Sequence, residues 1–151
     1  MNDRYLYRAK RKNWRELQKE KWWATGYLVN KKCGKYNTVG FEEFEAMIIV
    51  TSFSDGGIDW CYIDKDTICK STGLKDKNGK LIWENDIIEA HLDNLFPEDI
   101  SRFQVLWKDY SFKIRLEKEL YDDFCDDLSE LFEVAGNIFD NMELLEVEND
   151  T

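Results

Sequence analysis

The sequence predicts a mainly β or α+β protein in which an antiparallel sheet closes into a small SH3-like barrel. The chain has 151 residues and is 43% hydrophobic, which is enough apolar material for one core. Short apolar or alternating segments are separated by turn-forming residues at intervals of about 8–12 residues, as in antiparallel sheets and barrels. Residues 84–88 are similar to the entry strand of SH3-like barrels. Because no repeat or linker divides the sequence, we expect residues 1–151 to form a single domain.

The first part of the chain contains four predicted strands. Gly26 lies inside the second of them, and a glycine in a strand often marks a bulge or a close approach of another backbone. Residues 30–45 combine charged side chains with three turn-forming residues, which predicts a long, mobile hairpin connection. The predicted strands are residues 5–9, 22–29, 46–51 and 58–63.

The clearest local signal in the sequence is a hairpin in the middle of the chain. Asn78 and Gly79 both tolerate positive φ, so they predict a type I′ turn between two strands. Asn85 and Asp86 predict a second turn, which leads into a strand over residues 87–91. These four residues are therefore assigned structural roles.

The last third of the chain changes its hydrophobic period. Residues 103–107 and 111–115 predict another hairpin. Residues 117–131 form an acidic insertion with two alternatives, an amphipathic helix or a solvated loop, because aspartate is a poor helix former. Residues 131–139 return to a strand pattern, and residues 140–146 predict a short C-terminal helix.

The charge is distributed unevenly along the chain. The net charge is −10, yet residues 1–40 hold 11 Lys/Arg and 3 Asp/Glu, whereas residues 41–151 hold 10 and 28. Basic and aromatic residues are interleaved over residues 4–23 of the positive segment, which suits phosphate contact with base stacking, or docking to an acidic protein or a second copy. The candidate binding residues are Arg8, Lys10, Arg11, Lys12, Trp14 and Arg15.

The sequence contains little that indicates catalysis. His91 is the single histidine, so any Ser-His or Cys-His pair must include it. Residues 73–80 lack the spacing of a phosphate loop, and neither a dinucleotide fingerprint nor EF-hand spacing occurs. We therefore expect no catalytic residues, no cofactor and no metal. We also expect free thiols at all four cysteines, Cys33, Cys61, Cys69 and Cys125.

No apolar stretch reaches the length of about 18 residues that a membrane helix needs, and the first residues lack a signal peptide. We therefore expect a cytoplasmic protein with no membrane contact.

Five segments together resemble the YopX family in their order and spacing. They are residues 5–9, 23–29, 63–68, 72–88 and 132–145, and the fourth is the most specific. The family is typical of bacteriophages and prophages of Gram-positive bacteria, is mostly β, and has no established biochemical function. The resemblance implies such an origin, a location in the bacterial host cell, and no particular mechanism.

The sequence departs from the family pattern at two positions. Asn85 stands where the family usually has Gly, and asparagine tolerates the left-handed conformation that such a turn needs. Met142 stands where the family usually has Pro, which removes the fixed φ that favours the start of a terminal helix.

These observations favour a non-catalytic module that assembles with itself or binds another protein. One alternative is nucleic-acid binding through residues 4–23. A second alternative is an enzyme that uses His91 and nearby carboxylates.

Overall fold

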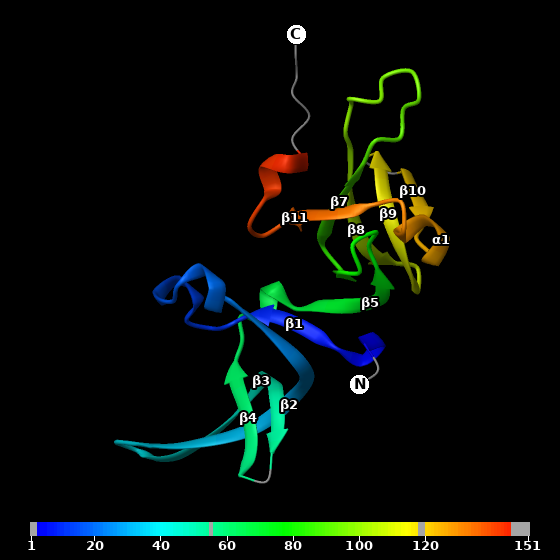
Figure 1. Ribbon diagram of the computed structural model, residues 1–151. Coiled ribbons are helices and arrows are strands. Elements are labelled where there is room, and N and C mark those ends of the chain that lie inside the picture. The colour runs from blue at the N-terminus through cyan, green and yellow to red at the C-terminus, as the bar shows by residue number, and fades with distance from the viewer. Residues whose placement is uncertain (1–2, 55, 118–119, 146–151) are drawn as a thin grey trace. The chain divides into compact units, whose positions relative to one another are not determined.

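The computed structural model describes residues 3–54, 56–117 and 120–145 (Figure 1). The chain is mainly antiparallel β with one short α-helix among the described residues, which confirms the predicted class. It forms two compact units, Met1–Lys70 and Ser71–Thr151. The first unit has 13 Lys/Arg and 10 Asp/Glu, a net charge of +3, and the second has 8 and 21, a net charge of −13. That residues 1–151 behave as one folding domain stays a prediction.

The first unit contains a sheet with the order β4-β3-β2-β1, and β1 also pairs with the start of β5. Its core consists of small and aliphatic side chains: Ala9, Ala24, Ile49 and Ile63 are buried together. Its strands are β1 (Tyr7–Lys10), β2 (Trp23–Asn37), β3 (Gly40–Ser54), β4 (Gly57–Tyr62) and the first residues of β5 (Cys69–Lys75). Its 3-10 helices are η1 (Asp3–Tyr5), η2 (Trp14–Glu16), η3 (Lys19–Lys21) and η4 (Lys65–Thr67).

Gly26 shows why β2 needs a glycine where it begins to pair with β3. A Cβ added at Gly26 would overlap the backbone carbonyl oxygen of Val50. The glycine therefore marks a close backbone approach, one of the two situations predicted for it.

The segment predicted as a mobile connection is instead a regular two-stranded ribbon. Strands β2 and β3 pair in continuous register from Tyr27 opposite Val50 to Asn37 opposite Gly40. Figure 1 shows this cyan ribbon extending beyond the end of β4. We call residues 30–37 and 40–47 the ribbon, because β1 pairs with β2 only as far as Gly26 and β4 pairs with β3 only from residue 48 onwards. Among the described residues, both outer edges of the ribbon therefore lack a neighbouring strand.

Cross-strand contacts explain why the ribbon is regular despite its exposure. The rings of Tyr36 and Phe41 lie 5.1 Å apart, and the Phe41 ring lies over Gly34, where no side chain occupies the space. Lys35 and Glu42 are directly opposite and form an ion pair of 3.9 Å. Such pairs stabilise neighbouring strands without burial in a core.

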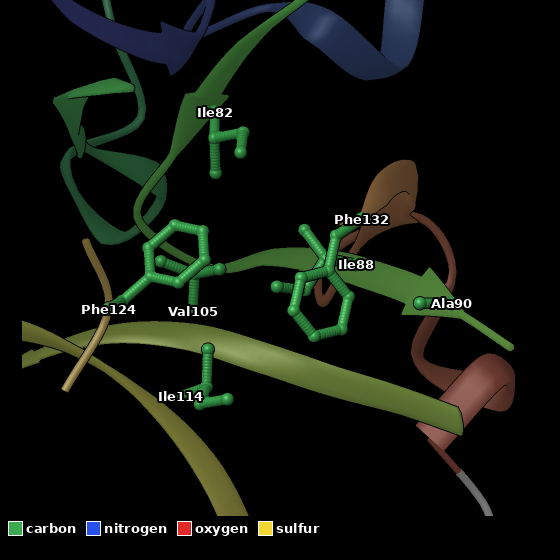
Figure 2. Packing of buried hydrophobic residues seen from close by; sticks show 7 residues of the cluster. All are labelled: Ile82, Ile88, Ala90, Val105, Ile114, Phe124 and Phe132. Atoms are coloured by element: carbon green, nitrogen blue, oxygen red, sulfur yellow. The ribbon is translucent and has the colours of Figure 1, made fainter. Parts of the chain in front are cut away.

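The second unit contains a five-stranded antiparallel sheet with the order β10-β9-β8-β7-β11, and a short hairpin of β5 with β6. Neither sheet order closes on itself among the described residues, so the predicted SH3-like barrel is not confirmed. The strands are β6 (Leu81–Trp83), β7 (Asp86–Ala90), β8 (Ser101–Lys108), β9 (Ser111–Glu117), β10 (Leu120–Asp123) and β11 (Glu133–Asn137). The buried core consists of Ile82, Ile88, Ala90, Val105, Ile114, Phe124 and Phe132 (Figure 2).

The acidic segment is neither one helix nor a loop, so both alternatives for residues 117–131 are wrong. Strand β10 pairs with β9, and helix α1 (Asp126–Ser129) is a single turn. Phe124 is buried between these elements, and its N–H donates to the carbonyl of Phe112. Pairing with β9 satisfies the backbone groups on one edge of β10, whereas a helix of aspartates would gain little from its intrinsic propensity. Residues 118–119 of the predicted insertion lie outside the described residues.

The C-terminal end contains a 3-10 helix, η5 (Met142–Leu145), within the range predicted for a short helix. The carbonyl of Asn141 accepts the N–H of Leu144, so the turn forms without the proline that the family usually has. Residue 146 of the predicted helix lies outside the described residues.

The type I′ turn lies at a different hairpin from the predicted one. In the loop between β5 and β6, residues 76–80, only Gly79 has positive φ, 81°, because the carboxylate of Asp76 accepts the N–H groups of Asn78 and Lys80 and fixes another turn. Asp109 and Tyr110, between β8 and β9, have φ values of 52° and 65°. Two consecutive positive φ angles in a two-residue loop are the signature of a type I′ turn.

The turn before β7 contains both of the predicted turn residues, Asn85 and Asp86. Asn85 has φ 70°. Asp86 is buried, and its carboxylate accepts the N–H of Trp83 at 2.8 Å.

Candidate functional site

Lys10, one of the predicted binding residues, is buried in a cage of tryptophans. Its side chain is on the face of the β1–β2 pair that also carries Trp23, and the residue is 3% exposed. The ammonium lies 3.8 Å from the ring centre of Trp14 and 4.5 Å from that of Trp22. Aromatic faces attract a cation, and the attraction increases when water is excluded. Lys10 therefore stabilises the N-terminal segment and is not placed to contact a phosphate.

Arg8 and Arg11 also make contacts within the segment. The guanidinium of Arg8 lies 4.8 Å from the ring centre of Trp23. Arg11 donates from Nη1 to the backbone carbonyls of Lys21 and Trp23. Three of the six predicted binding residues thus hold the basic segment together, a role that their positive charge alone does not reveal.

The remaining basic residues, Lys12 and Arg15, line a cavity of about 620 Å³ within the first unit. Lys65, which is not one of the predicted binding residues, lines the same cavity. Its walls combine apolar side chains with carboxylates and an amide. The other lining residues are Asn30, Glu45, Ala46, Met47, Tyr62, Ile63, Asp64 and Asp66.

Backbone contacts bring these distant parts of the sequence together around Asp64. The N–H of Lys12 donates to the carbonyl of Tyr62 at 3.0 Å, and the N–H of Asp64 donates to the carbonyl of Lys10 at 2.8 Å. The indole N–H of Trp14 donates to Oδ2 of Asp64 at 3.3 Å. The guanidinium of Arg15 stacks 4.3 Å from the ring centre of Trp14. Trp14 therefore positions both Asp64 and Arg15.

Two side chains near this region have shifted pKa values. Burial raises the pKa of the Cys61 thiol, and the positive charge and hydrogen bond of Arg11 lower it by less, so the net shift is upward. The contact between Tyr62 Oη and Cys33 Sγ, 3.7 Å long, raises the pKa of the Tyr62 hydroxyl. Both groups are therefore neutral at pH 7. None of the four cysteines forms a disulfide.

Among the described residues, His91 lacks the hydrogen-bonded nucleophile and orienting group that nucleophilic catalysis requires. The residue is exposed just after β7, and no hydrogen bond joins it to a carboxylate among the described residues. Nearby Asp93 uses Oδ1 to accept the N–H groups of Leu95 and Phe96. Within residues 3–54, 56–117 and 120–145, no group of three or more His, Cys, Asp or Glu side chains is placed to hold a metal.

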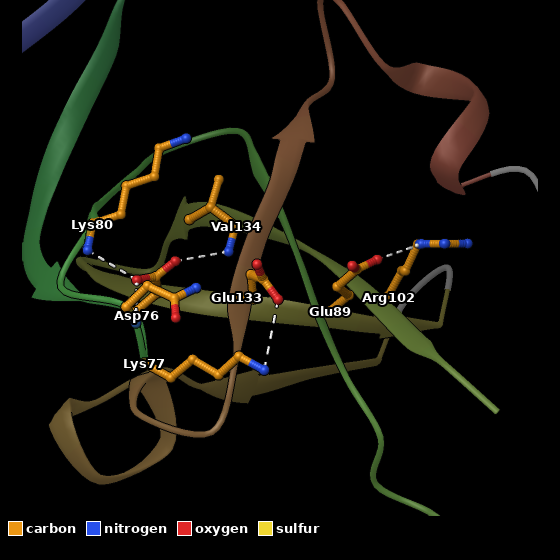
Figure 3. Close-up of polar contacts among 8 residues, drawn as sticks. Asp76, Lys77, Lys80, Glu89, Arg102, Glu133 and Val134 are labelled. Atoms are coloured by element: carbon orange, nitrogen blue, oxygen red, sulfur yellow. Dashed lines mark hydrogen bonds and ion pairs between the residues drawn. The ribbon is translucent and has the colours of Figure 1, made fainter. Parts of the chain in front are cut away.

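A buried carboxylate in the second unit has a structural role (Figure 3). Oδ1 of Asp76 accepts two N–H groups of its own turn, and Oδ2 accepts the N–H of Val134 on β11 at 3.0 Å. Burial raises the pKa of this carboxyl, but the three N–H groups and the nearby charge of Lys80 together lower it below its ordinary value. Lys77 and Glu133, 3.6 Å apart, join the same two elements.

None of the helices in the described part of the chain is long and apolar enough to cross a membrane. The protein is thus of the antiparallel β class. It has two compact units, and the first unit contains the ribbon and the charged cavity.

Comparison with known proteins identifies the family. The model of the YopX protein family matches residues 7–146, so the chain belongs to this family. The structure is similar to the crystal structure of protein EF1440 from Enterococcus faecalis, with a TM-score of 0.52 and 24% sequence identity. That similarity covers 93% of this chain and 96% of the other, and it supports the fold alone. Comparison with curated proteins gives no match.

Proposed function

We propose that this protein is a non-catalytic module that assembles with copies of itself through the ribbon. The observation that carries the proposal is that both strand edges of the ribbon lack a neighbouring strand within residues 3–54, 56–117 and 120–145, which leaves backbone N–H and C=O groups unpaired there. Exposed edges are templates for strand addition, and proteins usually block long ones.

The charges of the ribbon favour one arrangement of the copies. Lys31, Lys32 and Lys35 are on β2, whereas Glu42, Glu43 and Glu45 are on β3. If β2 of one copy pairs with β3 of another, lysines face glutamates across the new pair of strands. If β2 pairs with β2, like charges face each other and oppose association. The charges therefore favour a head-to-tail contact, which generates a ring or a filament.

The tip of the ribbon carries apolar side chains that a neighbouring copy would bury. Tyr36 is 85% exposed, Val39 is 93% exposed and Phe41 is 54% exposed. Burial of such surface contributes about 25 cal/mol per Å² to association before the entropic costs of binding. The tip thus adds an apolar contribution to the charge pairing of the strands.

A charge-swapped ribbon tests the arrangement. Lys32 is directly opposite Glu45 and Lys35 is opposite Glu42, so K32E/K35E/E42K/E45K keeps every opposite-charge pair inside the ribbon. We expect light scattering to show that the wild-type chain and the swapped chain each self-associate. When the two chains carry different labels and are combined, the labels should not appear in the same assemblies. The half-swapped K32E/K35E chain should be monomeric, and salt should weaken association.

Two results would reject this proposal. A wild-type chain that stays a strict monomer at all concentrations would exclude self-assembly. Free mixing of wild-type and swapped chains would exclude the charge-directed contact. Far-UV circular dichroism of each variant checks that the β structure persists, so that loss of association is not loss of folding.

Nucleic-acid binding through residues 4–23 is a second proposal, supported by the net charge of +3 in the first unit and by the exposed side chains of Lys12 and Arg15. Labelled single- and double-stranded DNA and RNA test it. Binding should weaken with salt and in the Lys12→Ala and Arg15→Ala variants, and absence of binding at low salt would reject it. The phage or prophage origin and the cytoplasmic location stay predictions.

A further inference from the structure

We infer that the cavity of the first unit is a binding site for a small phosphate ester with a hydroxylated body, the chemistry that sugar phosphates and nucleotides share. Three basic residues, Lys12, Arg15 and Lys65, line the site. This inference does not rest on self-assembly, because its basic residues lie outside the ribbon, although Asn30, Glu45, Ala46 and Met47 of the ribbon also line the cavity.

Two of the three carboxylates that line the cavity accept hydrogen bonds from neutral donors. Asp64 accepts the indole N–H of Trp14 through Oδ2 and the N–H of Asp66 through Oδ1. Glu45 accepts the amide of Asn30 at 3.2 Å. By contrast, the ammonium groups of Lys12 and Lys65 form no ion pair or hydrogen bond among the described residues.

The side chains of Lys12, Arg15 and Lys65 offer more positive charge than a ligand with one carboxylate group would neutralise. A phosphate monoester carries a charge near −2 at neutral pH and has three terminal oxygens, so it can contact an arginine fork and two ammonium groups together. Arg15 is stacked on Trp14, which holds its guanidinium in one orientation and lowers the entropy lost when it binds.

The rest of the lining suits the body of such a ligand. Ala46, Met47 and Ile63 provide apolar surface, and the carboxylate of Asp66 has no side-chain partner among the described residues, so it can accept hydrogen bonds from hydroxyl groups. A volume of about 620 Å³ is within the range of about 300–1,000 Å³ that small-molecule sites occupy. The carboxylate of Asp66 thus suits the donor groups of the ligand.

Isothermal titration calorimetry of the full chain at low salt tests this inference with AMP, ribose 5-phosphate and adenosine. We expect AMP to bind, and at least tenfold weaker binding in Arg15→Gln and in Lys65→Gln. Lys21→Gln is the matched control, because this exposed lysine of the same basic segment does not line the cavity. Equal binding of ribose 5-phosphate would assign the contacts to the sugar phosphate, and stronger binding of AMP would add contacts to the base.

The inference is overturned if neither phosphate ester binds at millimolar concentration, or if adenosine binds as tightly as AMP. It is also overturned if Lys21→Gln weakens binding as much as Arg15→Gln, because a diffuse positive field would then explain the affinity. Since the ribbon is unchanged in these variants, light scattering of the same samples reports self-assembly separately.

Discussion

Asp76 links a turn to a distant strand through one buried carboxylate. Three backbone N–H groups donate to it, and hydrogen bonds to a charged acceptor contribute more to stability than bonds between neutral groups. The turn of the β5–β6 hairpin and strand β11 are both held by this side chain. Its removal should therefore affect the second unit more than any surface carboxylate does.

We expect Asp76→Asn to lower the free energy of unfolding by about 2–3 kcal/mol at pH 7, because an amide has one acceptor oxygen and its NH₂ group faces N–H donors. The folded-state pKa of Asp76 is lowered, so its contribution is fully present above the unfolded-state pKa of about 3.9 and is lost as the pH falls through the folded-state value. Urea unfolding between pH 7 and pH 2 should show the difference from wild type narrowing. Glu130→Gln, at an exposed position, is the control, and a difference that does not change with pH would contradict the prediction.

Lys10 is expected to affect stability and not only binding. Lys10→Ala removes a buried side chain and its attraction to Trp14 and Trp22, so unfolding should become easier by about 2–4 kcal/mol. Urea denaturation measures this change. Lys21→Ala, in the same basic segment but exposed, should change stability by less than about 0.5 kcal/mol. Equal effects of the two substitutions would show that the tryptophan cage contributes nothing specific.

At the scale of elements, the turn between β8 and β9 carries unfavourable backbone conformations. Tyr110 has φ 65° and is 93% exposed, so its side chain packs on little else. Tyr110→Gly should stabilise the protein by about 0.5–1 kcal/mol, because glycine adopts this conformation without a Cβ penalty. Thermal unfolding measures the gain. Tyr110→Ala keeps the Cβ, so a similar gain from alanine would contradict the explanation.

The hairpins of the second unit could be predicted from the sequence, but the ribbon of the first could not. Strands such as β8 and β9 alternate apolar and polar residues because one face covers a core. Residues 30–45 are exposed except for the half-buried Lys31 and Cys33, so no apolar–polar alternation marks them, and the glycines and asparagine resemble a loop. The type I′ turn was predicted at Asn78 and Gly79 but lies between β8 and β9. At Asn78 and Gly79, the hydrogen bonds of the Asp76 carboxylate override the local turn preference.

The candidate site was partly predictable. Lys12 and Arg15 were singled out by the charge of the basic segment, and the structure places both at the cavity. Lys65 and Asp66 were missed because they lie about fifty residues away and come close only through the pairing of backbone groups around Asp64. The burial of Lys10 was not foreseeable either, because a lysine beside tryptophans has the same sequence pattern whether it is exposed or caged.

At the scale of the whole molecule, the continuity of β5 favours cooperative unfolding. Cys69 and Lys70 pair with β1, and later residues of the same strand pair with β6. We therefore expect one transition in scanning calorimetry, with equal calorimetric and van't Hoff enthalpies, in agreement with the predicted single domain. Two resolved transitions would show that residues 1–70 and 71–151 unfold independently.

The order in which the first sheet forms follows from the β2–β3 hairpin. Its pairing starts at Asn37 and Gly40, so each further pair closes only a short loop, and hairpins form in about 1–10 μs. The pairing of Tyr7 with Lys70 must instead close a loop of most of the unit, which is slower. The sheet is therefore expected to grow from the ribbon inward, so that its most exposed part is structured before its core is complete.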